Sequence, residues 1–331
     1  KMKLLASNES QNQNNSISVL MATFNGERFI KEQIKSILSQ TEKPKELIII
    51  DDHSNDSTLH VALKALNNSG INWKVYTRKK NIGYAKNFID GVRYCSGEYV
   101  AFCDQDDIWH PDKIRLASGL INSNRPELIF SNYVAVDSTA QKIISKFTYN
   151  NTTDNLHRSL LSNPIIPGMT MICKTEWLNM NLELLLNTLQ NHPSIPHDYL
   201  LSLGVSKSAK VQHLKYDLVF YRQHESNTIG LKRRKKYSYS DILFVEKQMK
   251  DLNDKILLLN FSKSCTWKVR NLVNESIDSA FLEFLELRKS RRIQLRNFLK
   301  PKNQFDSLKK SLKDLRVFAR IKIYKALRAI Q

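Results

Sequence analysis

Short apolar runs alternate with amphipathic segments along the first 137 residues of the chain. The runs are residues 17–22, 47–50, 73–76 and 99–103, and the segments of helical spacing that follow them are residues 27–38, 58–66, 85–94 and 113–121. A further apolar run covers residues 128–136. Continuous apolar runs are typical of strands that are buried on both faces. Their alternation with amphipathic helices predicts an α/β fold, in which a mostly parallel, Rossmann-like sheet is covered by helices.

The pattern changes twice after residue 137. Between residues 138 and 224 it is irregular, with a strand-like stretch at 170–173, a helical stretch at 176–189, a proline-containing loop at 192–196 and a second helix from Asp198. From Lys232 onward Pro occurs once and Gly not at all, while apolar residues keep helical spacing. We therefore expect a polar N-terminal lead (1–16), an α/β domain (17–230) with halves at 17–137 and 138–230, and an α-helical C-terminal region (231–331).

Positive charge is concentrated in that C-terminal region. The chain has 51 Lys and Arg against 32 Asp and Glu, a net charge of +19, of which residues 231–331 carry +16 and the remainder carries +3. A hydrophobic share of 41% and four cysteines without a C-x-x-C pair argue against a disordered chain and against a disulfide or zinc framework. No apolar run approaches the roughly 18 residues that span a bilayer, so we expect the chain to stay on the cytosolic side.

Polar side chains follow three of the expected strands. Thr23 follows the first, Asp51 and Asp52 follow the second, and the segment Asp104-Gln105-Asp106-Asp107 places three carboxylates directly after the fourth. Ligands of such sheets bind at the carboxyl ends of the strands. Repulsion among the three carboxylates is relieved most simply by an oxygen-preferring divalent cation, Mg²⁺ or Mn²⁺. The alternative is a polar turn in which the last acid caps the next helix.

These motifs occur in a recognisable order. They read SVLMATFN (18–25), LSQT (38–41), IIDDHSNDST (49–58), NIG (81–83) with Asn87, GEY (97–99) and DQDD (104–107). In order and spacing they resemble the family 2 glycosyltransferases of the GT-A fold, over about residues 16 to 230. The segment Tyr221-Arg222-Gln223-His224, with Asn227 and Gly230, resembles the rhamnosyltransferase-like members. The resemblance is specific for fold and reaction class and uninformative about which sugar is moved.

The resemblance implies roles for individual residues in binding a nucleotide sugar. Thr23 would line the base pocket, Asp52 would hydrogen-bond the pyrimidine ring, and Asp104 would meet the ribose and the metal. Asp106 would be the direct metal ligand. Further contacts beside the nucleotide sugar would come from Asn81, Lys86 and Asn87. The alternatives are a side-chain-stabilised turn around residues 51–54 and a solvated helix face after residue 83.

The resemblance also implies a catalytic base. Inversion at the sugar needs a group that takes the proton of the acceptor hydroxyl, and the family carries it as an acid at the head of a helix; here the candidate is Asp198, whose alternative role is to cap that helix. Gly168 would lie in the acceptor-side loop, where the absence of a side chain lets the backbone approach the donor sugar. His224 would contact the diphosphate or the metal, or else be structural.

The basic C-terminal region admits three interpretations. Residues 232–236 read KRRKK, and apolar residues recur every three or four positions between residues 298 and 327 among many Lys and Arg. This basic amphipathic pattern favours an anionic membrane surface. The alternatives are a helix that packs on the catalytic domain, and nucleic-acid binding, which we disfavour because no recognised nucleic-acid fold accompanies the charge.

The sequence therefore predicts an inverting, metal-dependent glycosyltransferase. It would move a sugar from a nucleotide diphosphate, dTDP-L-rhamnose or otherwise a UDP-sugar, to a glycan or lipid-linked glycan of a surface polysaccharide. Its expected location is the cytoplasm, peripheral on the inner face of the cell membrane. The alternative functions are a non-catalytic scaffold that binds nucleotide sugars and a nucleic-acid-binding protein that uses the basic C-terminal region.

Overall fold

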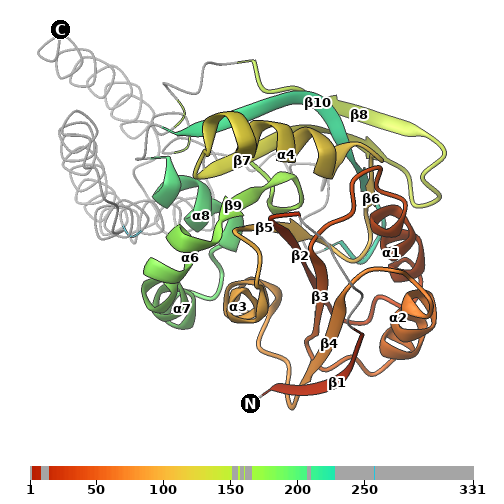
Figure 1. Cartoon of the computed structure of the whole chain (residues 1–331). Coiled ribbons are helices and arrows are strands. Elements are labelled where there is room, and N and C mark those ends of the chain that lie inside the picture. The colour runs from red at the N-terminus through yellow and green to blue at the C-terminus, as the bar shows by residue number, and fades with distance from the viewer. Residues whose placement is uncertain are drawn as a thin grey trace, which may run out of the picture. The chain divides into compact units, whose positions relative to one another are not determined.

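The computed structural model of the chain describes residues 2–8, 15–150, 156, 160, 166–206, 210–227 and 257. Ten strands form one sheet in the order β1-β4-β3-β2-β5-β9-β7-β10-β6, with β8 paired to β7 (Figure 1). The strands are β1 (Met2–Asn8), β2 (Ile17–Thr23), β3 (Glu46–Asp51), β4 (Trp73–Arg78), β5 (Tyr99–Cys103), β6 (Ile108–Trp109), β7 (Leu128–Val136), β8 (Ile143–Phe147), β9 (Ile172–Lys174) and β10 (Val211–Arg222). The α-helices are α1 (Ile30–Leu38), α2 (Thr58–Leu66), α3 (Tyr84–Gly91), α4 (Lys113–Asn124), α6 (Thr175–Met180), α7 (Leu182–Asn191) and α8 (His197–Val205).

The parallel part of the sheet determines where the polar strand ends meet. β2 runs parallel to both β3 and β5, and β3 runs parallel to β4. The carboxyl ends of these four strands therefore meet at one edge of the sheet. The rest is mixed: β9 pairs antiparallel with both β5 and β7, and β7 is parallel to β10.

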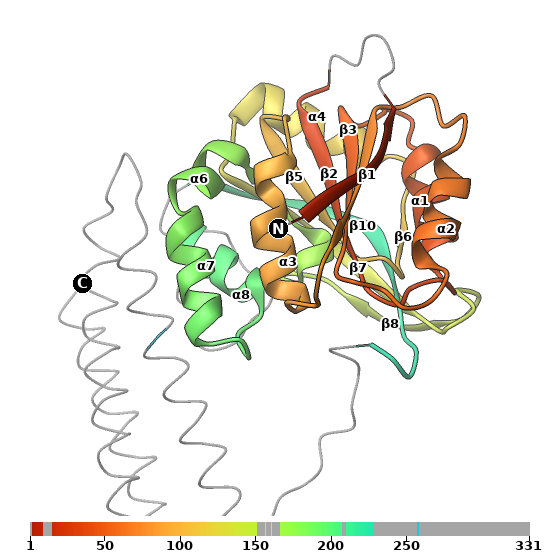
Figure 2. The same cartoon turned by 90° about the horizontal axis from the view of Figure 1, so that it is seen from below.

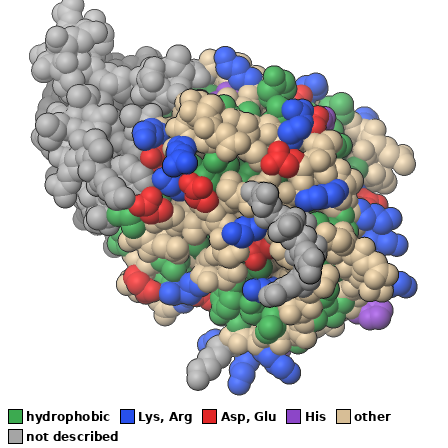
Figure 3. Space-filling model, in the orientation of Figure 1, with side chains coloured by type: hydrophobic (Ala, Val, Ile, Leu, Met, Phe, Trp, Pro, Cys, Tyr) green, Lys and Arg blue, Asp and Glu red, His purple; other side chains and the backbone are tan. Residues whose placement is uncertain are grey.

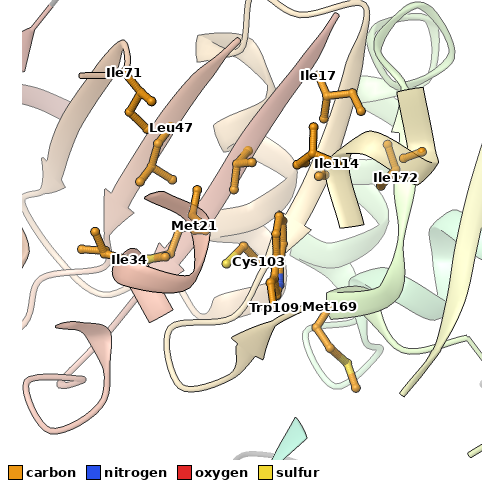
Figure 4. Packing of buried hydrophobic residues seen from close by; sticks show 14 of the residues in the cluster. Ile17, Met21, Ile34, Leu47, Ile71, Cys103, Trp109, Ile114, Met169 and Ile172 are labelled. Atoms are coloured by element: carbon orange, nitrogen blue, oxygen red, sulfur yellow. The ribbon is translucent and has the colours of Figure 1, made fainter. Parts of the chain in front are cut away.

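Apolar side chains pack on both faces of the parallel strands, as their unbroken apolar runs require. Buried residues of β2, β3 and β5 form one cluster with α1, α2 and α4, of which Met21, Ile34 and Leu47 are seen in Figure 4. On the opposite face α3 lies close to the sheet, because a Cβ added at Gly91 would stand 2.7 Å from the side chain of Ile50. Figure 2 shows α1 and α2 on one side of β2 and β3, and α3 on the other.

Several predicted elements differ from the observed ones. The helix expected over 176–189 is two helices, α6 and α7, which are separated at Asn181, where the side-chain Nδ2 donates to the carbonyl of Trp177 at 2.9 Å. The helix expected from residue 27 begins at Ile30, because residues 26–29 form a turn. No strand was expected in the N-terminal lead, yet β1 pairs antiparallel with β4. The long strand β10 was not predicted either.

All described residues except Leu257 belong to one compact unit, Lys1–Lys232 with Cys265–Arg270. The expectations for residues 231–331, including the basic run and the amphipathic pattern, lie outside the described residues. Within the described part of the chain, no helix combines the length and apolar composition needed to cross a bilayer. On the face drawn in Figure 3, positive and negative side chains are interspersed.

Candidate active site

The turn after β3 begins with a fully buried carboxylate, Asp51. Its Oδ1 accepts from the hydroxyls of Thr23 (3.0 Å) and Ser54 (2.5 Å). Its Oδ2 accepts from the backbone N–H of Ser54 (2.9 Å) and from the hydroxyl of Thr77 (3.3 Å). One carboxylate thus joins the carboxyl ends of β2, β3 and β4. The hydroxyl of Thr23, which was expected to line a base pocket, donates to this carboxylate.

Asp52 organises the segment that precedes α3. Its two oxygens accept the backbone N–H groups of Ile82 (2.9 Å) and Gly83 (2.8 Å), and the guanidinium of Arg78 lies 3.9 Å away. Gly83 has a φ of +87°, in the left-handed region that favours glycine. Burial raises the pKa of Asp52, although the two N–H donors and the guanidinium oppose that rise.

The remaining residues expected beside the nucleotide sugar lie around this segment. Asn81 is exposed, and its Oδ1 accepts the N–H of Gly83 at 3.0 Å. Asn87 is buried and bridges the Nε of Arg78 (2.6 Å) to the carbonyl of Ile50 (2.8 Å). Lys86 instead bonds to the side chain of Gln190 on α7. The structure therefore connects Asn81, Asn87 and Asp52 in one network and places Lys86 on the side of α3 that faces α7.

The acid-rich turn connects β5 to β6. The amide of Gln105 accepts the N–H of Phe24 (2.9 Å) and donates to its carbonyl (3.0 Å), so the turn is fastened to the loop after β2. Asp106 Oδ2 lies 2.8 Å from Nε2 of His224. Two of the three residues expected at the metal, Asp106 and His224, are thus in contact although 118 positions separate them in the sequence.

A buried arginine at the end of β10 holds this turn, and sequence reasoning missed its role. Arg222 donates from Nε to the carbonyl of Asp106 (2.9 Å), from its backbone N–H to Oδ1 of Asp107 (3.1 Å), and from a terminal nitrogen to Glu32 of α1 (2.5 Å). Asp107 therefore fixes the turn to β10 and does not cap α4, whose N-cap is Asp112. The only signal in the sequence that could have pointed to Arg222 is its position in the polar segment that ends at His224.

Within the described residues the acids of this turn are only partly satisfied by hydrogen bonds, and Asp104 is partly exposed. Within the described residues no side-chain hydrogen bond reaches Asp104, and the buried Oδ2 of Asp107 has no partner. Burial, followed by the charge of Asp106, raises the pKa of both carboxyls. The described residues include no ready group of three His, Cys, Asp or Glu for a metal. The pair formed by Asp106 and His224, with unsatisfied carboxylates beside it, nevertheless suits a cation that keeps open positions for substrate oxygens.

Asp198 lies in the first turn of α8, whose N-cap is Pro196, so it is not the capping residue. Its oxygens accept the backbone N–H of Gly168 (3.0 Å) and of Tyr199 (2.7 Å). Burial raises the pKa of Asp198 to about 6, and these N–H groups limit the rise. A carboxylate with this pKa is ionised at neutral pH and more basic than an exposed one.

The imidazole of His197 fills the space behind this carboxylate. It stacks on Phe88 at 4.5 Å between ring centroids, and neither ring nitrogen has a hydrogen-bond partner among the residues that the structure describes. Burial lowers the pKa of His197 to about 3, so the ring is neutral. A Cβ added at Gly168 would stand 2.9 Å from Nε2 of His197. The position therefore requires glycine for lack of space.

The base candidate and the acid-rich turn lie at the same edge of the sheet. The charge of Asp198 raises the pKa of Asp104, and both acids raise the pKa of Tyr84, which burial shifts to about 12. The structure thus brings together Asp104, Asp106, His224 and Asp198. A carboxylate of raised pKa facing a cluster of acids and a histidine is suited to proton transfer next to a bound cation.

Comparison with known proteins identifies this arrangement. The family model of glycosyl transferase family 2 matches residues 18–179. A dTDP-rhamnosyl transferase of Shigella flexneri is 31% identical over 216 residues, which cover 63% of this chain and 73% of that protein. The chain belongs to glycosyl transferase family 2. A UDP-Glc:alpha-D-GlcNAc-diphosphoundecaprenol beta-1,3-glucosyltransferase of Escherichia coli is 28% identical over 238 residues, which cover 70% of the chain and 87% of that protein.

Solved structures agree on the fold of this family 2 transferase. The crystal structure of S. aureus TarS 1-349 in complex with UDP superposes with a TM-score of 0.57 at 18% identity, over 95% of this chain and 90% of that one. The fold is therefore the GT-A fold, as the sequence predicted.

Proposed function

We propose that this family 2 transferase moves a sugar from a nucleotide diphosphate donor to a hydroxyl of a growing surface polysaccharide or lipid-linked oligosaccharide, with inversion at the sugar. One observation carries the proposal: a partly buried carboxylate of raised pKa, Asp198, lies close enough to the acids after β5 for its charge to raise the pKa of Asp104. The donor is dTDP-L-rhamnose or otherwise a UDP-sugar. The names of the two relatives, which specify dTDP-rhamnosyl transfer and a UDP-Glc-dependent reaction on a diphosphoundecaprenol-linked sugar, support these classes.

The residues of β2, β3 and α3 would bind the nucleotide. Asp52 would accept the ring N–H of the pyrimidine, and Thr23 and Asn81 would flank the base and the sugar. The cross-links made by Asp51 support this role, because they fix three strand ends before any ligand arrives. A preformed pocket loses less entropy on binding.

Asp106 and His224 would hold a divalent cation, Mn²⁺ or Mg²⁺, with Asp104 next to them. The cation would supply neutralising charge at the leaving diphosphate. Arg222 would keep Asp106 in place through its bond to the backbone carbonyl of that residue.

Asp198 would accept the proton of the acceptor hydroxyl. Its pKa of about 6 makes it ionised at pH 7, and two backbone N–H groups fix its orientation. A general base is most effective when its pKa is close to the working pH. Inversion follows if the acceptor approaches on the side of the sugar opposite the diphosphate, where Asp198 would take its proton.

The test uses the full chain and a panel of nucleotide sugars: dTDP-L-rhamnose, UDP-glucose, UDP-N-acetylglucosamine and GDP-mannose. Thermal unfolding is recorded with Mn²⁺ and with a chelator. A donor at 100 times its Kd stabilises the native state by about 2.7 kcal/mol. We expect one dTDP- or UDP-sugar to raise the Tm with Mn²⁺ and to release its nucleoside diphosphate. If no nucleotide sugar raises the Tm, the proposal is wrong. Binding without any release of diphosphate, with a lipid-linked oligosaccharide present to accept the sugar, favours the non-catalytic scaffold.

The charge of residues 231–331 supports a second element of the proposal, namely that the protein associates with the anionic inner face of the cell membrane. Each Lys or Arg close to such a surface contributes about 1 kcal/mol. We expect the full chain to sediment with anionic vesicles at low salt, to be released as salt rises, and to ignore neutral vesicles. Equal binding to neutral vesicles contradicts this, and tight, salt-dependent binding to RNA or DNA instead would favour the nucleic-acid alternative.

A further inference from the structure

Lys113, the first residue of α4, is buried beneath the acid-rich turn, and nothing in the proposed chemistry uses it. Its side chain is 1% exposed, and it is the one lysine that is buried among the described residues. The ammonium donates to the carbonyl of Met169 at 2.6 Å and lies 4.1 Å from the centroid of the Trp109 ring. Trp109 and Met169 are both labelled in Figure 4, among the buried hydrophobic residues.

Stability alone does not explain a lysine at this position. Burial lowers the pKa of Lys113 to about 7, although the electrostatic effects of Cys103, Asp107 and Asp104 oppose this shift. A cation at the beginning of a helix is also disfavoured by the helix dipole. A well-packed apolar side chain of similar volume often stabilises a fold as well as a buried charge does, or better. Lys113 therefore carries a cost that some other feature has to offset.

The bond that Lys113 makes leads directly to the proposed base. Met169 lies in the short 3-10 helix Gly168–Thr170, and the preceding residue, Gly168, donates its N–H to Oδ2 of Asp198. The carbonyls at the end of such a helix have no partner inside it, and Lys113 supplies one. His197 lies against Gly168 and leaves no room for a side chain there. Lys113 and His197 thus both contact the short helix.

We propose that Lys113 is a positioning residue: by bonding the carbonyl of Met169 it fixes the Gly168–Thr170 helix, and the N–H of Gly168 in turn fixes the carboxylate of Asp198. Lys113 thereby links α4 to Asp198, the proposed catalytic base on α8. The part of this inference that concerns turnover rests on the proposed function. The part that concerns the loop does not.

Two substitutions of nearly equal length separate the hydrogen bond from the charge. Lys113→Met removes both, whereas Lys113→Gln keeps an N–H donor for the carbonyl of Met169 and removes only the charge. Arg115→Met is the matched control, because it removes one positive charge from the same helix at a side chain that is 53% exposed and paired with Asp112. The Tm of Lys113→Met should stay close to that of the parent or fall slightly, because loss of the desolvated charge is favourable whereas the carbonyl of Met169 is left without its donor.

The first readout is hydrogen–deuterium exchange of peptides covering residues 166–171 in the full chain without ligand. We expect exchange to be at least tenfold faster in Lys113→Met, and close to the parent rate in Lys113→Gln and Arg115→Met. Because no substrate is present, this result stands or fails independently of the proposed function. Unchanged exchange in Lys113→Met overturns the proposal, as does equally fast exchange in Lys113→Gln. Unfolding of both lysine variants also overturns it, because the role would then be structural.

The second readout is turnover of the nucleotide sugar identified above, followed by release of its diphosphate. A base displaced by about 1 Å can cost about 100-fold in rate. We expect kcat to fall by about 10- to 100-fold in Lys113→Met, with the Kd for the donor unchanged, and to recover substantially in Lys113→Gln. A loss of donor affinity that accounts for the whole loss of rate would place Lys113 in donor binding and overturn the positioning role.

Discussion

Two acid-bearing turns lie on either side of β2, and they differ in how their carboxylates are satisfied. After β3, Asp51 accepts four hydrogen bonds and Asp52 accepts two backbone N–H groups. After β5, no described side-chain hydrogen bond reaches Asp104, and one oxygen of Asp107 is buried without a partner. The first turn has its donors built in, whereas in the second only Oδ1 of Asp107 and Oδ2 of Asp106 have a described partner.

The difference separates a scaffold from a site that is ready for a ligand. A buried carboxylate that accepts several hydrogen bonds stabilises the fold, whereas one without donors costs free energy until a proton or a cation joins it. The turn after β5 tolerates this free-energy cost because other hydrogen bonds hold it in place. Arg222 donates to a backbone carbonyl of the turn, and the side-chain amide of Gln105 bonds to the loop after β2. The hydrogen bonds of the turn after β3, which join the ends of β2, β3 and β4, offset this free-energy cost.

Asp198 combines features of both turns, and replacing it should have the largest effect on catalysis. It accepts two backbone N–H groups as Asp52 does, yet burial raises its pKa to about 6. We expect Asp198→Asn to lower kcat by about 10²- to 10⁴-fold, the usual contribution of a general base. Donor affinity, measured by calorimetry, should change little. A variant that loses donor affinity and Tm in proportion to its rate would instead reveal a structural residue.

The same pKa sets a pH dependence for the parent protein. The base acts in its ionised form, so kcat should be level above pH 7 and half-maximal near pH 6. Below that value kcat should fall about tenfold per pH unit, because the ionised fraction falls at that rate. A pH–rate profile with saturating donor checks this. The descending limb should be absent from the residual activity of Asp198→Asn, and its persistence there would assign the limb to another group.

Asp106→Ala tests the turn after β5. Removing even an indirect support of a metal ligand typically costs 10- to 100-fold in metal affinity, so loss of the ligand itself should cost about 100-fold or more. Titration of Mn²⁺ into the nucleotide complex measures it. The Tm without metal should stay within a few degrees of the parent value or rise, because the variant removes one of three mutually repelling carboxylates. Turnover that is unchanged in the presence of a chelator would contradict the metal role.

The sequence predicted the strands and acids of this comparison but not which acids would be satisfied. The strands at 99–103 and 128–136 have the predicted bounds, because unbroken apolar runs between polar turns leave few alternatives. The donors to Asp51 come from three strand ends, and those to Asp106 and Asp107 come from β10, more than 100 positions away. Such pairings depend on strand order. Local periodicity carries no information about strand order. For the same reason the sequence did not predict the roles of Arg222 and Lys113 or the pairing of β1 with β4.

Asp51→Asn tests the turn after β3 as scaffold. Asn offers one accepting oxygen where Asp51 uses two, so its amide group would face the N–H of Ser54. Each buried donor left without a partner costs about 1–3 kcal/mol, and we expect a loss of about 2–3 kcal/mol in the free energy of unfolding, measured in urea. Asp106→Ala is the matched control and should cost less than about 1 kcal/mol. Equal losses in the two variants would remove the distinction between the turns.

Asp52→Asn should have the smallest effect. It distinguishes the two roles of Asp52, which are to hold the segment before α3 and to accept a hydrogen bond from the pyrimidine ring. The variant keeps one acceptor for the N–H groups of Ile82 and Gly83, so the stability loss should be about 1 kcal/mol. If Asp52 also accepts from the pyrimidine ring, the Kd for UDP or dTDP should rise about tenfold, the effect of one charge-assisted hydrogen bond. This rise should persist in chelator, whereas the effect of Asp106→Ala should disappear there, because only the latter acts through the cation. A nucleotide Kd that is unchanged in Asp52→Asn would contradict contact between Asp52 and the base.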